Sequence, residues 1–217
     1  MSVVQNPIIG RASGKFSTAI FQKWKNKNVL RSKPLTVANP DTAGQQQRRK
    51  MFAQAVFYGR AISPILIIGF SGFKAVLTWM NVFLKRNLDQ SILAGVAPAF
   101  SVDLTKMVIS EGPMTPTPPL SCSGVNASQN VAVTWNPTII APDQAATDIA
   151  CIVVFNETSE AVGYLIGSAI NQRSTGAAVV VTNFAATSAD VLYAYLFFMR
   201  LDGSIVSSND YYSDIVP

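Results

Sequence analysis

The hydrophobic pattern of the chain changes from helical to strand-like near Pro98. Before it, apolar residues recur every three or four positions over 52–62 and 73–84, which is the spacing of amphipathic helices. After it, short apolar runs alternate with polar turns, as is typical of antiparallel strands. The pattern predicts two modules: a hairpin-and-helix module over residues 1–97 and a β-sandwich domain over residues 98–217.

A β-hairpin is predicted at the N-terminal end of the first module. Two short β-like runs within residues 14–37 flank Lys25-Asn26-Lys27-Asn28, and the composition of this segment is that of a hairpin turn. Period two places Phe21, Lys23 and Lys25 on one face of the first strand, so we expect that face to be basic.

Two helices are predicted after the hairpin. Asn39-Pro40-Asp41-Thr42 predicts the start of the first, because Asn is a strong N-cap and Pro is favoured at the first helical position. Ser63-Pro64 predicts its end. Its apolar stripe is predicted to consist of Phe52, Ala55, Val56, Gly59 and Ile62. The second follows a glycine-rich break at 69–72, with Phe73 on its stripe, and ends at Lys85-Arg86, where cations complement the helix dipole.

The second module consists of predicted strands separated by turns. The proline-rich segment 114–119 is expected to be a linker or an edge, because proline lacks the N–H of a central strand. The fold class is therefore expected to be α+β: an N-terminal β-hairpin plus two helices, followed by an antiparallel immunoglobulin-like β-sandwich without a disulfide. The predicted strands lie at 100–109, 130–135, 149–156, 162–170, 177–181 and 191–201.

Charge is divided unequally along the chain. Residues 1–110 hold 15 Lys or Arg and 3 Asp or Glu, whereas residues 111–217 hold 2 and 9. These give +12 and −7, which sum to the net +5 of the whole chain. Complementary charge on two halves favours a protein that acts by contact, because mixed signs on all faces are the usual solution for a monomer.

Little in the composition points to catalysis or to a bound metal. The chain has no histidine, which excludes Ser-His-Asp and Cys-His arrangements and leaves Cys122 and Cys151 too few partners for a zinc site. We expect both to be free thiols, with a disulfide between them as the alternative. No lysine lies in a nucleophile motif, and no glycine-rich loop opens a helix to hold phosphate. The sequence therefore predicts no enzyme and no cofactor.

Four carboxylates could be considered as an acid/base pair of the glycosidase type. They fall in predicted loops and at strand ends, where solvated charge is the ordinary expectation. We therefore expect them to be surface groups. They are Asp143, Asp148, Glu157 and Glu160.

Two basic clusters are the best candidates for a contact surface. Cations beside an aromatic ring can hold phosphate and stack a base, so packaged DNA is one possible partner. A basic face is more often solvated or paired with an acidic protein surface, and this alternative stays open. The candidate residues are Lys23, Trp24, Lys25, Lys27, Arg48, Arg49 and Lys50.

No segment has the pattern of a membrane span or of a secretory signal. The most apolar run, 65–70, is far shorter than the ~20 residues of a spanning helix. The first fifteen residues contain no continuous apolar stretch followed by a cleavage pattern. We therefore expect the protein to start in a cytoplasm.

The segment from Asn39 to Phe52 resembles a family signature. Asn39-Pro40-Asp41-Thr42, Gln45-Gln46, Arg49 and Phe52 match N-P-x-T-x-x-Q-Q-x-x-R-x-x-F, found in domains of unknown function common in Bacteroidota and in their phages, including crAss-like phages. The likeness covers nearly the whole chain. It implies a non-catalytic protein with an N-terminal hairpin and helix and a C-terminal β-sandwich, and it supplies no catalytic residue.

The resemblance and the charge division together suggest a virion structural protein. We expect a repeated subunit of the connector, neck or tail rings of a crAss-like phage, assembled in the bacterial host cytoplasm and located in the virion. Its partners would be other virion proteins and further copies of itself, with non-specific contact to packaged DNA as a possibility. A bacterial surface or adhesion module that binds glycan or protein is the alternative. Ring, fibre and capsid positions stay open.

Overall fold

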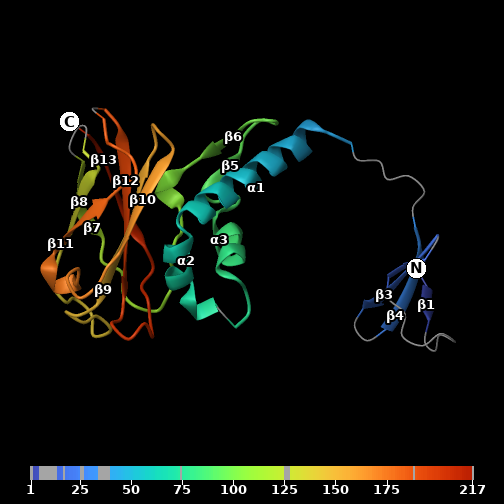
Figure 1. The fold of residues 1–217 in the computed structure, drawn as a ribbon, viewed down its shortest axis with the longest axis horizontal. Coiled ribbons are helices and arrows are strands. Elements are labelled where there is room, and N and C mark those ends of the chain that lie inside the picture. The colour runs from blue at the N-terminus through green and yellow to red at the C-terminus, as the bar shows by residue number, and fades with distance from the viewer. Residues whose placement is uncertain are drawn as a thin grey trace. The chain divides into compact units, whose positions relative to one another are not determined.

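The chain folds into two compact units, Met1–Thr42 and Ala43–Pro217, drawn in Figure 1. The division therefore falls at 42/43 and not at the predicted 97/98. The helices belong with the strands that follow them, because both contribute to one core. The structure is a computed structural model that describes residues 2–4, 14–16, 18–24, 27–33, 40–73, 75–124, 128–187 and 189–216.

The first unit is a four-stranded antiparallel sheet with strand order β1-β4-β3-β2. The predicted hairpin is confirmed as β3 and β4, which pair from Ala19 with Ser32 to Trp24 with Lys27. The turn residues Lys25 and Asn26 lie outside the described residues. The two short outer strands were not predicted. The strands are β1 (Ser2–Val4), β2 (Gly14–Phe16), β3 (Ala19–Trp24) and β4 (Lys27–Ser32).

Few of the side chains described in this sheet are buried. Among the side chains described in the first unit, Val29 alone is buried. Ile20 and Phe21 on β3 and Leu30 on β4 are only half-buried. A unit this small rarely buries enough apolar surface to be stable without a partner, a metal or a disulfide.

The second unit begins with α1 (Ala43–Ala61). The predicted start at Pro40 is wrong, because residues 40–42 are not helical, and Asn39 lies outside the described residues. Thr42 directly precedes the helix, and Thr is also a favoured N-cap residue. The predicted end before Ser63-Pro64 is confirmed.

The predicted stripe of α1 is confirmed at Ala55 and Gly59, which are buried, and is wrong at Phe52. Met51 and Ala55 are fully buried, whereas Phe52 is 50% exposed. Gly59 lies on the buried face, where a Cβ atom would come within 2.9 Å of Met80 Sδ on α3. The two helices approach so closely that only glycine fits there without a shift.

Two shorter helices follow α1. The helix α2 (Ser63–Gly69), which was not predicted, has proline in its first turn. The helix α3 (Trp79–Asn87) begins later than the predicted Phe73, at the N-cap Thr78, whose Oγ1 accepts a hydrogen bond from Asn81 N at 3.3 Å. A 3-10 turn at Ser71–Phe73 lies between them.

No single helix in the described part of the chain is long and apolar enough to cross a membrane. Only the bent pair α1 and α2, whose axes meet at 86°, reaches that length and apolarity when the two are taken together.

A small hairpin of β5 (Ile92–Ala94) and β6 (Phe100–Val102) follows the helices. The predicted strand 100–109 is only partly correct, because a 3-10 helix at Leu104–Lys106 interrupts it. Asp103 caps this helix by accepting a hydrogen bond from Thr105 N at 3.1 Å. Together with α1, the hairpin encloses a minor core of Met51, Ala55 and Ile92.

The rest of the second unit contains two antiparallel sheets, with orders β11-β8-β7 and β10-β9-β12-β13. The predicted bounds of β8, β9 and β11 are confirmed, while β10 and β12 end earlier than predicted, and β7 and β13 were not predicted. The strand β7 begins at Pro119, the last residue of the predicted linker or edge 114–119, and lies at the edge of its sheet, with an irregularity between Pro119 and Ser121. The strands are β7 (Pro119–Gly124), β8 (Asn130–Trp135), β9 (Ile149–Asn156), β10 (Ala161–Ile166), β11 (Ala177–Val181), β12 (Val191–Met199) and β13 (Asp210–Ile215).

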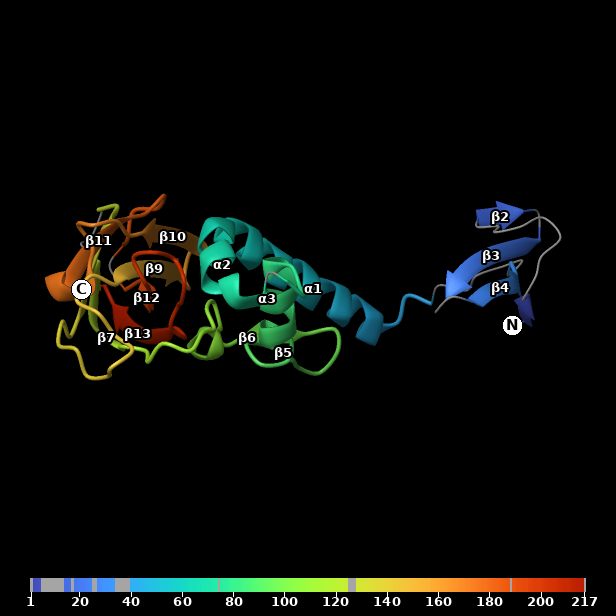
Figure 2. The same ribbon diagram turned by 90° about the horizontal axis from the view of Figure 1, so that it is seen from below.

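The larger sheet is shared by two cores, and its strand β9 is buried along its whole length. Ile152 and Val154 face the smaller sheet and pack with Val133 and Leu196. The alternate positions, including Phe155, face the helices and pack among α1, α2 and α3. The second unit thus has three layers: helices, a four-stranded sheet and a three-stranded sheet (Figures 1 and 2).

Candidate functional site

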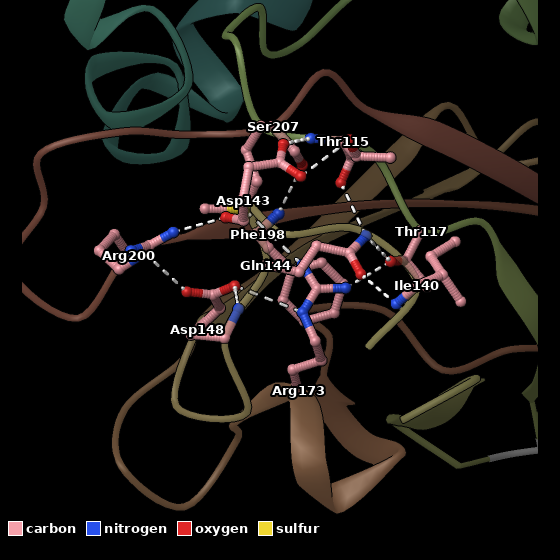
Figure 3. Close-up of polar contacts among 12 residues, drawn as sticks. Thr115, Thr117, Ile140, Asp143, Gln144, Asp148, Arg173, Phe198, Arg200 and Ser207 are labelled. Atoms are coloured by element: carbon pink, nitrogen blue, oxygen red, sulfur yellow. Dashed lines mark hydrogen bonds and ion pairs between the residues drawn. The ribbon is translucent and has the colours of Figure 1, made fainter. Parts of the chain in front are cut away.

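Three connections meet at one end of the two packed sheets. They are the β8–β9, β10–β11 and β12–β13 connections, spanning residues 136–148, 167–176 and 200–209. The segment 114–117, which leads into β7, joins them. Figure 3 shows a polar network in which side chains from all four segments converge.

The centre of this network is a buried ion pair between Asp148 and Arg173. Both side chains are 0% exposed, and Arg173 Nε lies 3.4 Å from Asp148 Oδ2. The backbone adds a shorter contact, because Arg173 N donates to the Asp148 carbonyl oxygen at 2.7 Å. Asp148 Oδ2 also accepts a hydrogen bond from Ala145 N at 2.7 Å, within the same connection. The β8–β9 and β10–β11 connections are therefore joined by both charge and backbone.

The Arg173 guanidinium has further partners on every side. Its carbon Cζ lies 3.9 Å from the ring centroid of Phe198 on β12. Its terminal nitrogens donate to Thr117 Oγ1 and, at 3.6 Å, to Met114 Sδ. Trp135 Nε1 donates to the Arg173 carbonyl oxygen at 2.9 Å. Burial lowers the pKa of Arg173 and Asp148 opposes this shift, and a guanidinium in such surroundings stays charged.

Arg200, from the β12–β13 connection, supplies a second cation. Its Nε lies 3.1 Å from Asp148 Oδ1. The angle makes this an ion pair without a hydrogen bond, so neither atom has a hydrogen-bond partner among the described residues. Arg200 also donates to the carbonyl oxygen of Asp143. The third connection is thus tied to the first.

Asp143 and Gln144 complete the network by reaching the segment before β7. Thr115 donates to the Asp143 carboxylate through its backbone N–H and, at 3.1 Å, through its hydroxyl. The backbone hydrogen bond from Thr115 is the main reason that the pKa of Asp143 lies below its usual value, and the Arg173 charge adds to the effect. Gln144 Nε2 donates to the Thr115 carbonyl oxygen at 3.2 Å, while its Oε1 accepts from Ile140 N at 2.9 Å.

The network joins the loops at this end of the two sheets to one another. Two guanidinium groups and two carboxylates balance in charge, and the terminal nitrogens of both arginines donate to protein acceptors. The Asp148 carboxylate lies between the two guanidinium groups and links the connections that carry them. We therefore regard this end of the sandwich as a preorganised surface whose loops keep one geometry.

The four carboxylates considered from the sequence do not form one site. Asp143 and Asp148 lie at the loop end just described, whereas Glu157 and Glu160 follow the opposite end of β9. The expectation of solvated charge is confirmed for the two glutamates, which are exposed. It is wrong for Asp148, because that carboxylate has two buried or half-buried arginines as partners.

The sequence contains one indication of this network that the sequence-based predictions did not use. Arg173 and Arg200 are the only Lys or Arg residues between positions 111 and 217. Two isolated cations in an apolar, acidic region are candidates for paired, buried charge. Their partner Asp148 could not be identified from spacing, because 25 residues separate it from Arg173.

The predicted basic contact residues are divided between the two units. Lys23, Trp24 and Lys27 lie on β3 and β4 of the first unit, where Trp24 pairs with Lys27 in the sheet register, and Lys25 lies outside the described residues. The others lie on the first half of α1 in the second unit and are exposed. Arg48 forms an exposed ion pair with Asp89. These α1 residues are Arg48, Arg49 and Lys50.

Both cysteines are free thiols, as expected, and both are buried. Burial raises the pKa of Cys122 and of Cys151 to about 12. Thiols with such a pKa are protonated at neutral pH and react slowly. Within the described ranges, no three His, Cys, Asp or Glu side chains are grouped closely enough to hold a metal ion.

A family model for a family of unknown function, DUF6266, matches residues 11–213. The chain belongs to this family. The match covers parts of both units. No curated protein and no solved structure is similar enough to this chain to match.

Proposed function

We propose that the chain is a virion structural protein, a repeated subunit of a connector, neck or tail ring of a crAss-like phage, and that it acts through contacts with its copies and other virion proteins. The observation that carries this proposal is the first unit, a basic sheet in which Val29 is the one buried side chain described. Such a unit gains most of its stability from whatever it contacts.

The charges of the two units support a contact between copies. Residues 1–42 hold 7 Lys or Arg and 1 Asp or Glu, whereas residues 43–217 hold 10 and 11. The first unit is therefore +6 and the second −1, which together give the net +5. A positive unit that contacts the acidic surface of the next copy makes a head-to-tail interface, which closes into a ring when the rotation allows. Cations left on the ring surface could contact packaged DNA without sequence preference.

We also propose that the two packed sheets are immunoglobulin-like. Seven strands divide into β7, β8 and β11 on one sheet and β9, β10, β12 and β13 on the other. Paired neighbours such as β7–β8, β9–β10 and β12–β13 alternate with connections that cross between the sheets. This division of strands supports the assignment.

The oligomeric state of the purified full-length chain tests the proposed function. Mass photometry across salt concentrations should find oligomers at low salt that dissociate near 1 M salt, where the Debye length is ~3 Å. Mass spectrometry of purified virions should find the chain in many copies. A chain that stays monomeric at low salt and is missing from virions would contradict the proposal.

A surface or adhesion module is the second candidate. The observation that favours it is the loop end of the sandwich, where Ile139, Ile140 and Ile170 are 49%, 65% and 79% exposed above the buried ion network. Rigid loops with exposed apolar tips are a common way to build a binding surface. Fractionation that places the protein in the cell envelope would favour this candidate over the virion subunit.

A further inference from the structure

A pocket of about 280 Å³ in the second unit combines apolar walls with two carboxylates. It lies among α1, the β5–β6 hairpin and the turn between β9 and β10. Its walls include Tyr58, Phe100 and Leu104, and its acidic side is formed by Glu157 and Glu160. The pocket is distinct from the ion network, because these glutamates follow the opposite end of β9.

The lining of this pocket contains no Lys or Arg. Glu157 accepts a hydrogen bond from the Tyr193 hydroxyl at 3.2 Å. Glu160 has a φ of 52°, in the left-handed region that non-glycine residues rarely adopt. Two carboxylates beside aromatic rings suit the head of a Lys or Arg side chain, while the apolar wall suits its methylene groups.

The charges of Glu157 and Glu160 act on the tyrosines next to the pocket. Burial is the main reason that the pKa values of Tyr58 and Tyr193 are raised, and the charge of Glu157 raises both further. Glu160 acts on Tyr58 in the same direction. A cation placed there would therefore meet a favourable field in a partly desolvated site.

The first unit supplies the cations that fit this pocket. Residues 1–40 hold all seven of its Lys and Arg residues and no Asp or Glu. In its sheet, Lys15 and Arg31 pair with Ile20 from the two sides, so the three residues share one face, and both cations are exposed. This face presents positive charge around an apolar residue, which complements acidic groups around aromatic rings.

We propose that the pocket formed by Tyr58, Phe100, Glu157 and Glu160 receives a Lys or Arg side chain from the basic sheet of a second copy of this chain. The contact rests on the proposed function, since it specifies the acidic half of the head-to-tail interface. It explains why the small basic sheet is joined to a unit that is stable on its own core.

Charge reversal in the full-length chain tests this proposal. E157K/E160K should raise the dissociation constant of self-association at least about tenfold at low salt, and K15E/R31E should do the same. A 1:1 mixture of the two variants should associate again. The negative sheet of K15E/R31E then meets the positive pocket of E157K/E160K, and the unchanged sheet and pocket of the two variants also complement each other. The matched control D202K/D214K changes the net charge by the same amount on exposed aspartates outside the pocket and should associate like the wild type. Circular dichroism and thermal unfolding of each variant verify folding.

The outcomes separate this proposal from the proposed function. If the wild type associates and E157K/E160K associates equally well, the pocket is not the interface, while the ring subunit stands. If the chain carrying all four substitutions is a folded monomer and the mixture of the two double variants does not associate, these charges do not complement one another between copies, and the proposal is overturned. If the wild type is monomeric at every salt concentration, both proposals fail.

Discussion

The second unit encloses an ion pair in its interior, whereas the described cations of the first unit lie on the surface of a small sheet. In the second unit, Asp148 and Arg173 are completely enclosed and sit beside a continuous aromatic and aliphatic core. In the first unit, Lys15 and Arg31 are exposed, and Val29 alone is buried among the described side chains. The comparison teaches that the second unit has a large core of its own, whereas the described side chains of the first unit contribute little buried surface.

The largest effect is expected from breaking the buried ion pair. D148A should lower the free energy of unfolding by about 3–5 kcal/mol, because it leaves the Arg173 guanidinium buried without a counter-charge. Denaturant unfolding monitored by Trp135 fluorescence measures the change, since Trp135 donates to the Arg173 carbonyl oxygen. D148A/R173M should recover part of the loss, because no isolated charge is then buried. A loss below about 1 kcal/mol for D148A would show that the pair is not needed.

The next largest effect is expected from cavities in the core of the second unit. These substitutions test whether the helices and the sheets unfold as one cooperative unit. Ile65 on α2 and Ile152 on β9 are both fully buried, so I65A and I152A should each cost about 2–5 kcal/mol. Both variants should shift the unfolding transitions reported by Trp79 and by Trp135 equally, in chains where the other tryptophans are changed to Phe. Transitions that separate, with I65A moving only the Trp79 signal, would restore a boundary near residue 97.

A smaller effect concerns the pH dependence of the second unit. Asp190 accepts hydrogen bonds from Thr187 N and Asn156 Nδ2, both at 2.8 Å, and the first of these is the main reason that its pKa is lowered. A lowered pKa in the folded state contributes stability that is present above the ordinary value near 4 and is lost as the pH falls below it.

D190N should therefore reduce stability at pH 7 by about 1–3 kcal/mol and should flatten the loss of stability between about pH 5 and pH 2. Thermal unfolding across this range measures both effects. D202N is a matched control, because the pKa of Asp202 is also lowered, mainly by the Ser204 side chain, but its carboxylate is exposed in a turn. An unchanged pH profile for D190N would contradict the assignment.

The smallest effect is expected at the exposed pair Arg48–Asp89. Both side chains are about 60% exposed, so R48A should change the free energy of unfolding by about 0.2–1 kcal/mol. The double variant R48A/D89A, measured in a double-mutant cycle, isolates the pair. A coupling energy as large as that of the buried pair would contradict the expectation that an enclosed ion pair contributes more stability than an exposed one.

The sequence predicted the strands better than the helices. For β8, β9 and β11, apolar runs bounded by turn residues gave the observed ends. On α1, apolar residues lie on most of its circumference, so spacing alone could not decide between Met51 and Phe52 as the buried position. The tertiary contacts with α3 and the β5–β6 hairpin made that choice.

The candidate site could be predicted only in part. The charge division correctly indicated that the N-terminal region is basic, and it did not indicate that Asp148, Arg173 and Arg200 would meet. These residues lie in three different connections, and only the packing of the two sheets brings their ends together. The domain boundary was wrong for the same reason, since the change in periodicity near Pro98 falls inside a single core.

The sharing of the four-stranded sheet by two cores also limits how the chain can be shortened. A protein lacking residues 43–110 would keep both sheets of the sandwich but would expose Phe155, Tyr195 and Phe197, which now pack under the helices. A broad aromatic sheet surface of this kind promotes aggregation. Expression of the shortened protein should therefore yield insoluble material, because the helices cover this aromatic surface in the full chain.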